Sequence, residues 1–268
     1  MKNLLLASKN SKLSTQQTLA LIGFAGLTTV LMMVVPVLSW FNYPFRLLLT
    51  MVHELSHGLA AVLTGGNFVR FIIEPNGAGL AYTAGGLRFI VIPAGYLGTA
   101  LFGAVLILLG RNHRWSRWAI GLIGGAFFLF GLIYGLPGIF TGLVTGEAGG
   151  AILATISGWL FGLIFLIIAL KANPSGIIFW IHFLAIQAAL TTFSDLWGLI
   201  GLTTQGGQIP ANDALSMSNL TYIPAIIWAM LWVLIAIVLI GGAIWLTWVQ
   251  PVMRGYQKSN LMDNWPTK

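Results

Sequence analysis

The sequence has no cysteine and few charged residues, and each shortage restricts what the protein can be. Without cysteine there is neither a disulfide framework nor a thiolate metal site, so any metal must be held by histidine, aspartate or glutamate. Only 7% of the 268 residues are charged and 57% are hydrophobic, whereas roughly a quarter of the residues of a soluble protein are charged. This composition argues against a water-soluble globule and predicts an integral, multi-pass membrane protein.

Long apolar runs indicate how often the chain crosses the membrane. About seven runs have the length of a transmembrane helix, roughly twenty residues. They cover residues 18–40, 45–63, 87–109, 118–136, 148–170, 175–202 and 222–249. The first run is too long for a signal peptide and is predicted to remain as a span. The predicted fold class is an all-α polytopic membrane protein, with one transmembrane domain over residues 18–249 and polar tails at residues 1–17 and 250–268.

Positive charge exceeds negative charge, with 13 lysines and arginines against six acidic residues. The basic residues lie mainly in the tails and short connections, where contact with anionic lipid headgroups explains them better than nucleic acid does. If the chain has seven spans, the lysines near its start lie on one side of the membrane. The larger group of basic residues follows the third, fifth and seventh spans and lies on the other side. The charges then indicate no single orientation, and the membrane itself and the oligomeric state stay open.

The connection after the second predicted span has the pattern of a β-hairpin. In NFVRFIIEPNGAGLAYT, residues 67–83, β-branched and aromatic residues flank the turn signal Pro75-Asn76-Gly77. The sequence therefore predicts a small hairpin between two membrane helices.

The second apolar run carries the motif His53-Glu54-Leu55-Ser56-His57. Residues four apart lie on one helix face, so His53 and His57 can offer two imidazole nitrogens to one metal ion. Glu54 projects beside them and can take a proton from water and deliver it to a leaving amine, as zinc proteases require at this position. Ionisable groups inside a membrane span are costly and usually mark function, so the motif predicts a zinc site with Glu54 as the catalytic acid and base.

A zinc site needs a third protein ligand, and the residues offer two candidates. Asp195 is preferred because it lies within a long apolar run, where a metal would account for a costly carboxylate. Asp213 is the alternative; it follows Asn212 at the expected start of a short helix, where either residue could serve as a helix cap. Three other acidic residues are expected in loops or a tail and are weak candidates: Glu74, Glu147 and Asp263.

Two segments of the chain resemble the site-2 protease family of intramembrane zinc metalloproteases, and most closely its peptidase M50B-like group. They are MVHELSHGLAAVLTGG, residues 51–66, and AGYLGTALFGAVLILLG, residues 94–110. The resemblance extends over about residues 45–249.

The resemblance implies a role for several positions. His53 and His57 would be zinc ligands and Glu54 the catalytic residue, and an aspartate in a later span, here Asp195, would complete the site. The usual family signature at that aspartate has an Asn-Pro element and an Asp-Gly pair, whereas this chain has Ser194-Asp195-Leu196. Family members also have a β-element that pairs with unwound substrate, and the hairpin at residues 67–83 occupies its place.

The expected function is therefore hydrolysis of a peptide bond in or near the membrane segment of a protein substrate, with Zn²⁺ as cofactor. The rival interpretation is a transporter or an inactive scaffold that keeps the motif as a structural metal site. A transporter is expected to show paired interrupted helices in corresponding halves, and the sequence contains no such pair.

Overall fold

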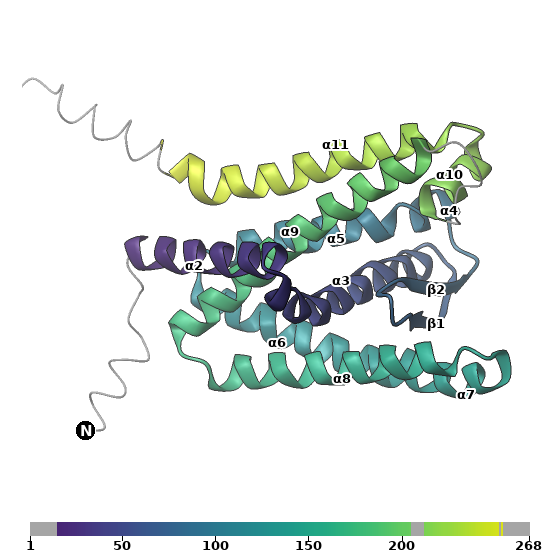
Figure 1. The fold of residues 1–268 in the computed structure, drawn as a ribbon, viewed down its shortest axis with the longest axis horizontal. Coiled ribbons are helices and arrows are strands. Elements are labelled where there is room, and N and C mark those ends of the chain that lie inside the picture. Colours follow the sequence, from purple (N-terminus) through teal and green to yellow (C-terminus); the bar gives the residue numbers. More distant parts are fainter. Residues whose placement is uncertain (1–14, 205–211, 252, 254–268) are drawn as a thin grey trace, which may run out of the picture.

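The structure, a computed structural model, describes residues 15–204, 212–251 and 253. The longer helices run along the long axis of the molecule, and a two-stranded sheet lies with several short helices at one end, which we call the hairpin end (Figure 1). Helix α2 begins and segment η2 finishes at the opposite end, which we call the terminal end. The elements in chain order, with η for a π-helical segment, are α2 (Thr15–Val34), α3 (Pro36–Leu63), β1 (Asn67–Ile73), β2 (Gly79–Ala84), α4 (Arg88–Val91), α5 (Ala94–Leu109), α6 (His113–Phe130), η1 (Gly131–Gly135), α7 (Leu136–Thr145), α8 (Ala148–Lys171), α9 (Pro174–Thr204), α10 (Asp213–Thr221), α11 (Ala225–Ile244) and η2 (Trp245–Val249). The predicted tails lie almost entirely outside the described residues.

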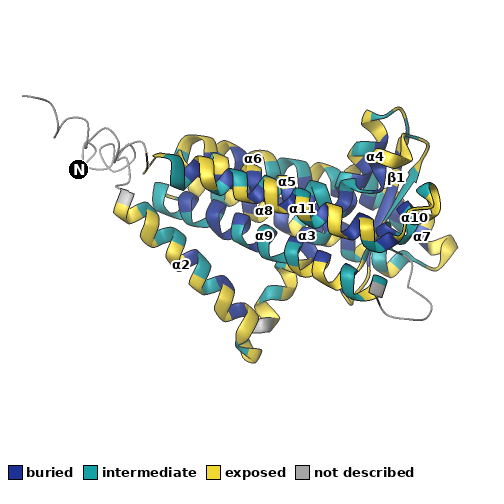
Figure 2. Ribbon diagram, turned by 90° about the horizontal axis from the view of Figure 1, so that it is seen from above, coloured by how far each residue is buried: buried dark blue, intermediate teal, exposed yellow. Residues whose placement is uncertain are grey.

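Five helical stretches of the described chain are long and apolar enough to cross a membrane, so the seven predicted spans are not confirmed. These stretches are Gln16–Val34, His113–Thr145, Ala148–Lys171, Pro174–Thr203 and Ala225–Val249. The predicted third span corresponds to α5, which has only 16 residues, and α3 carries the polar motif, which lowers its hydropathy. Exposed residues cover the outer faces of the helices (Figure 2), as expected of surfaces in contact with lipid. The protein is an integral multi-pass membrane protein.

The break between the first two helices lies earlier than the sequence predicted. Helix α2 ends at Val34, Val35 is extended, and α3 begins at Pro36, a residue that suits the first helical turn because it has no N–H to donate. The predicted boundary near Pro44 is instead continuous helix. At the break the chain changes direction, and Figure 2 shows α2 running obliquely away from the other long helices.

The predicted β-hairpin is confirmed. Strands β1 and β2 pair antiparallel, from Asn67 opposite Ala84 to Ile73 opposite Gly79. In the turn, Gly77 has a φ of 86°, which favours glycine, and its N–H donates to the carbonyl of Glu74 at 2.8 Å. The hairpin packs against α3, and this contact brings β2 next to the motif.

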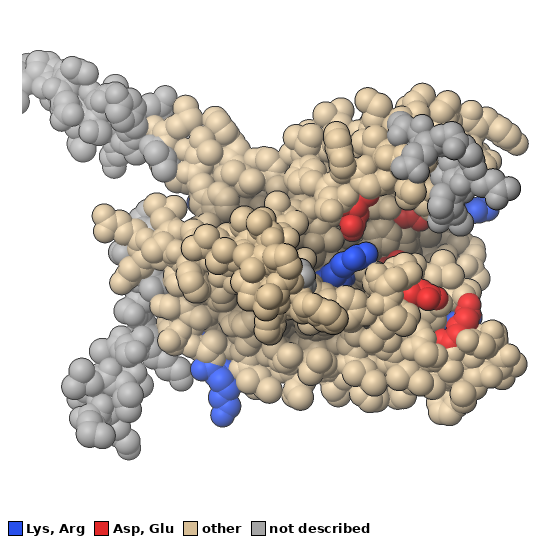
Figure 3. All heavy atoms as spheres, in the orientation of Figure 1, with Lys and Arg blue, Asp and Glu red and all other residues tan. Residues whose placement is uncertain are grey.

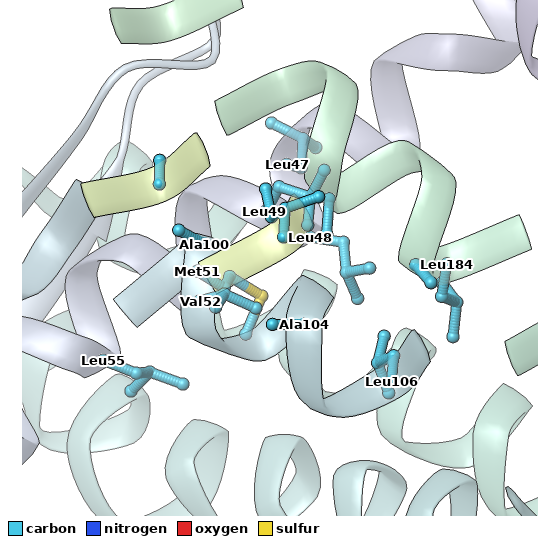
Figure 4. Packing of buried hydrophobic residues seen from close by; sticks show 14 of the residues in the cluster. Leu47, Leu48, Leu49, Met51, Val52, Leu55, Ala100, Ala104, Leu106 and Leu184 are labelled. Atoms are coloured by element: carbon cyan, nitrogen blue, oxygen red, sulfur yellow. The ribbon is translucent and has the colours of Figure 1, made fainter. Parts of the chain in front are cut away.

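Close packing holds the motif-bearing part of α3 in place. Leu48 and Met51 of α3 are fully buried, and Figure 4 shows them near Ala100 and Ala104 of α5. Small side chains let helices approach closely, and van der Waals packing drives helix association where the surrounding lipid is equally apolar. The buried face of α3 therefore fixes the direction in which its polar side chains point.

Candidate metal centre

The two histidines of the motif lie side by side on α3, as their spacing predicted. Nε2 of His53 and Nε2 of His57 are 3.1 Å apart, and the rings meet edge to face with centroids 4.8 Å apart. Both side chains are largely buried, with 19% and 10% of their surfaces exposed. Two ring nitrogens therefore converge on one point.

Neighbouring elements orient the two rings. Nδ1 of His57 lies 2.7 Å from the carbonyl oxygen of Val91, at the end of α4, and because a carbonyl only accepts, Nδ1 carries the proton. In a neutral ring this leaves a lone pair on Nε2, the usual arrangement of a metal-binding histidine. The ring of Tyr96 packs edge on to His53, with centroids 4.7 Å apart, and stacks in turn on Trp232 of α11.

Asp213, the alternative third ligand, lies against the histidine pair. Its Oδ2 is 3.2 Å from Nε2 of His53 and 3.2 Å from Nε2 of His57. The helix cap that the sequence suggested for this region is made by Asn212, whose side chain accepts from the N–H of Leu215 at 2.9 Å. Asp213, in the first turn of α10, is thus free to face the histidines. Burial alone raises the pKa of its carboxyl, but hydrogen bonds and charge from the two histidines outweigh burial and hold that pKa below its ordinary value.

The structure does not bring Asp195, the third ligand preferred from the sequence, into this group. His53, His57 and Asp213 form a group of side chains that could hold a metal ion, and Asp195 is not a member. It lies on α9 with an exposed side chain, close enough to interact electrostatically with His53 and Arg46. The structure therefore places Asp213, and not Asp195, beside the two histidines. Asp195 was preferred because a carboxylate within an apolar run is costly unless a metal accounts for it, but it does not lie with the two histidines.

Glu54 is buried between the motif helix and the hairpin, with 5% of the residue exposed. It accepts a hydrogen bond from the backbone of Ala81 in β2. A Cβ built on Gly79, the first residue of β2, would lie 2.5 Å from Oε1 of Glu54, so only glycine leaves room for the carboxylate. Strand β2 therefore positions Glu54 directly beside the histidine pair.

The separations among the three ligand atoms fit zinc. In a tetrahedral site with metal–ligand bonds of about 2.0–2.1 Å, two ligand atoms are about 3.3 Å apart. The three observed separations are 3.1, 3.2 and 3.2 Å. Three electron-rich atoms at these separations call for a positive charge between them. Two imidazoles and one carboxylate are a donor set that zinc enzymes use, and this set leaves one of four positions for water or substrate.

Gly95, at the start of α5, limits the space around the ligands. A Cβ on this residue would overlap Nε2 of both His53 and His57. We expect Gly95→Ala to weaken zinc binding by about tenfold to a hundredfold, the usual cost of disturbing the groups that orient ligands. Zinc retained against a graded series of chelator concentrations measures the change.

Gly125→Ala is the matched control for that substitution. Gly125 is also helical, in α6, but a Cβ there meets nothing within 4 Å. Alanine is favoured over glycine in helices by about 1 kcal/mol, so this variant should be at least as stable as the wild type and bind zinc equally well. Equal zinc affinity in both variants would contradict the tight fit at Gly95.

A polar network that the sequence did not predict ties the hairpin to the start of α8. Glu147 accepts hydrogen bonds from Arg70 at 2.6 Å, from Tyr82 at 2.6 Å and from Thr145 at 3.1 Å. The Arg70 guanidinium also lies 3.8 Å from the centre of the Tyr82 ring. The hydroxyl of Tyr82 and the guanidinium of Arg70 lower the pKa of the Glu147 carboxyl, which therefore stays ionised at neutral pH. The network links both strands of the hairpin to the helical bundle.

Comparison with known proteins gives one family match. Residues 24–243 match the family described as Peptidase M50B-like, a stretch that includes the motif, the hairpin and both candidate aspartates. No curated protein and no solved structure matches the chain. The match confirms the resemblance seen in the sequence.

Proposed function

Because this chain belongs to the Peptidase M50B-like family, we propose that it is an intramembrane zinc metalloprotease that cleaves membrane proteins in or near a membrane segment. One observation carries the proposal: His53, His57 and Asp213 converge at zinc-like separations, with the Glu54 carboxylate on the adjoining residue of the same helix. A structural zinc site needs four closed ligands, whereas these three leave a position for reaction.

Each of these side chains has a distinct task in the proposed reaction. His53, His57 and Asp213 would hold zinc, which when bound polarises a carbonyl and lowers the pKa of water. Glu54 would take a proton from the attacking water and deliver it to the amine nitrogen that leaves. The backbone of Ala81 orients the Glu54 carboxylate, and burial of Glu54 keeps bulk water from competing for its proton.

The hairpin is the element best placed to hold an extended substrate. Strand β2 contacts Glu54 through Gly79 and Ala81, so a peptide paired with this strand would lie along the reacting groups. Strand addition holds a chain extended through backbone hydrogen bonds and so presents a peptide bond for attack. Pairing of the substrate with the hairpin stays a prediction that rests on the family resemblance.

Removal and return of metal test the proposed function. Purified protein in detergent or vesicles, offered a panel of single-span substrates, should lose cleavage when treated with a chelator and regain it when zinc is added back. Mass spectrometry of the products should place the cut in or next to the substrate's membrane segment. Cleavage that persists after all metal has been removed would rule out a metalloprotease.

A further inference from the structure

Basic residues of the described chain gather at the terminal end. The connection between α5 and α6 carries Arg111, with Arg114 and Arg117 in the first turns of α6, and Lys171 ends α8. Arg117 donates to the carbonyls of Ala169 and Ala172, which joins the two connections at one end of the bundle. This end also receives the start of α2 and the finish of η2 (Figure 1).

The sequence that flanks these two helices adds charge of the same sign. Three lysines precede α2, and one arginine and two lysines follow η2: Lys2, Lys9, Lys12, Arg254, Lys258 and Lys268. Because α2 begins and η2 finishes at the same end, both flanking stretches and both connections count toward one side of the membrane. The sequence alone left the orientation open, because an odd number of predicted spans would place the two flanking stretches on opposite sides of the membrane.

The hairpin end is poor in basic residues and rich in acidic ones. It carries Arg70 and Arg88, with Arg46 of α3 lying against the hairpin turn at Gly77, and Arg70 is neutralised by its ion pair with Glu147 at 2.6 Å. Figure 3 shows the acidic side chains of this face over the half of the molecule that holds the hairpin and α10. The connections at this end are therefore close to neutral or acidic.

The metal centre lies near the hairpin end. His57 is six residues before the end of α3, or about 9 Å along the helix axis at 1.5 Å per residue. Asp213 comes from α10, a short helix at that end of the bundle, and the hairpin reaches Glu54 from the same end. A substrate would therefore approach the site from this side of the membrane.

Short connections and flanks rich in lysine and arginine stay in the cytoplasm. We propose that the terminal end faces the cytoplasm and that the site opens at the opposite face, so its substrates are membrane proteins whose cleaved segment reaches the non-cytoplasmic half of the bilayer. The statement about substrates rests on the proposed function, whereas the orientation does not.

Single cysteines can report the orientation directly because the chain has none of its own. Ser218→Cys in α10 and Ser175→Cys in the first turn of α9 are a matched pair, since both serines are half-buried and at opposite ends of the bundle. In intact bacterial cells that express the full chain, a membrane-impermeant maleimide should label Ser218→Cys and leave Ser175→Cys at the background of the cysteine-free wild type. Opening the cells should expose Ser175→Cys to the reagent.

The opposite pattern, or equal labelling of both variants in intact cells, would overturn the orientation. If Ser218→Cys does not react even in opened cells, Asn219→Cys replaces it, because Asn219 is exposed. A cooperative thermal unfolding transition of each purified variant, at the wild-type temperature, shows that it has folded. If the two variants are labelled as expected but no substrate is cleaved, the proposed function is contradicted and the orientation is supported. Cleavage of a substrate whose scissile segment lies in the cytoplasmic half would overturn the substrate class.

Discussion

Glu54→Gln is expected to slow peptide hydrolysis severely while bound zinc stays unchanged. Glutamine has the same shape and can keep a hydrogen bond to the backbone of Ala81, but it cannot accept a proton from water. Loss of a general acid and base slows a reaction by about a hundredfold to ten-thousandfold. Glu54 is not among the three side chains that converge as ligands, so zinc content should equal that of the wild type. Cleavage rates check the expected slowing of hydrolysis, and zinc per chain, measured on the same preparations, checks the unchanged metal content.

This variant also separates the protease from its main rival. A transporter or an inactive scaffold with a structural zinc site would show no difference between wild type and Glu54→Gln on a panel of single-span substrates. Asn219→Gln, an exposed amide substitution on α10, is a control for handling and should cleave at the wild-type rate. Proteolysis by Glu54→Gln at the wild-type rate would refute the catalytic role of Glu54.

Features set by neighbouring residues were predictable from the sequence. The four-residue spacing of His53 and His57 decides which helix face they share, whatever packs around them. The hairpin depends on the turn chemistry of Asn76 and Gly77, which is equally local: Asn76 accepts from the N–H of Ala78, and Gly77 adopts a positive φ. Each of these elements carries its own signal in a few consecutive residues.

Features set by distant residues were not predictable. Asp213 meets His53 across 160 positions of sequence, and Arg70 meets Glu147 across 77. The preference for Asp195 rested on the cost of a carboxylate within an apolar run, but that cost does not show which side chains meet in the fold, and Asp195 lies exposed on α9. The pair Asn212-Asp213 did indicate a second role for one of its members. A helix start needs one capping side chain, so the other side chain of the pair was available as a ligand.

The predicted number of spans is not confirmed, for a related reason. Hydrophobic runs show how much apolar sequence is present but do not show how helices divide it between lipid and protein contacts. Residues of α3 face other helices and the hairpin more than lipid, so this helix can carry His53, Glu54 and His57. These polar residues lower its mean hydropathy. The helix that carries the reactive motif is therefore not among the five candidate spans, although the sequence predicted a span over residues 45–63.

A matched pair of substitutions tests whether Asp213 or Asp195 is the third zinc ligand. Asp213→Asn is expected to lose zinc and with it all cleavage, because the amide removes the anionic oxygen that lies 3.2 Å from both histidines. Disturbing groups that merely orient ligands costs tenfold to a hundredfold in affinity, so loss of a ligand should cost about a hundredfold or more. The cap of α10 is made by Asn212 and is untouched, which should preserve the fold.

Asp195→Asn is the comparison that decides between them. It makes the same chemical change at an exposed position of α9 outside the group of candidate ligands, so zinc affinity should stay at the wild-type level. Chelator competition gives both affinities, and thermal unfolding of the zinc-free proteins shows whether either change acts through the fold. If Asp195→Asn lost zinc and Asp213→Asn kept it, the ligand preferred from the sequence would be correct, and the close approach of Asp213 would have to serve another purpose. The 3.2 Å separations support the first outcome, because an unliganded carboxylate gains its place beside two imidazoles only when they share a proton or a metal ion.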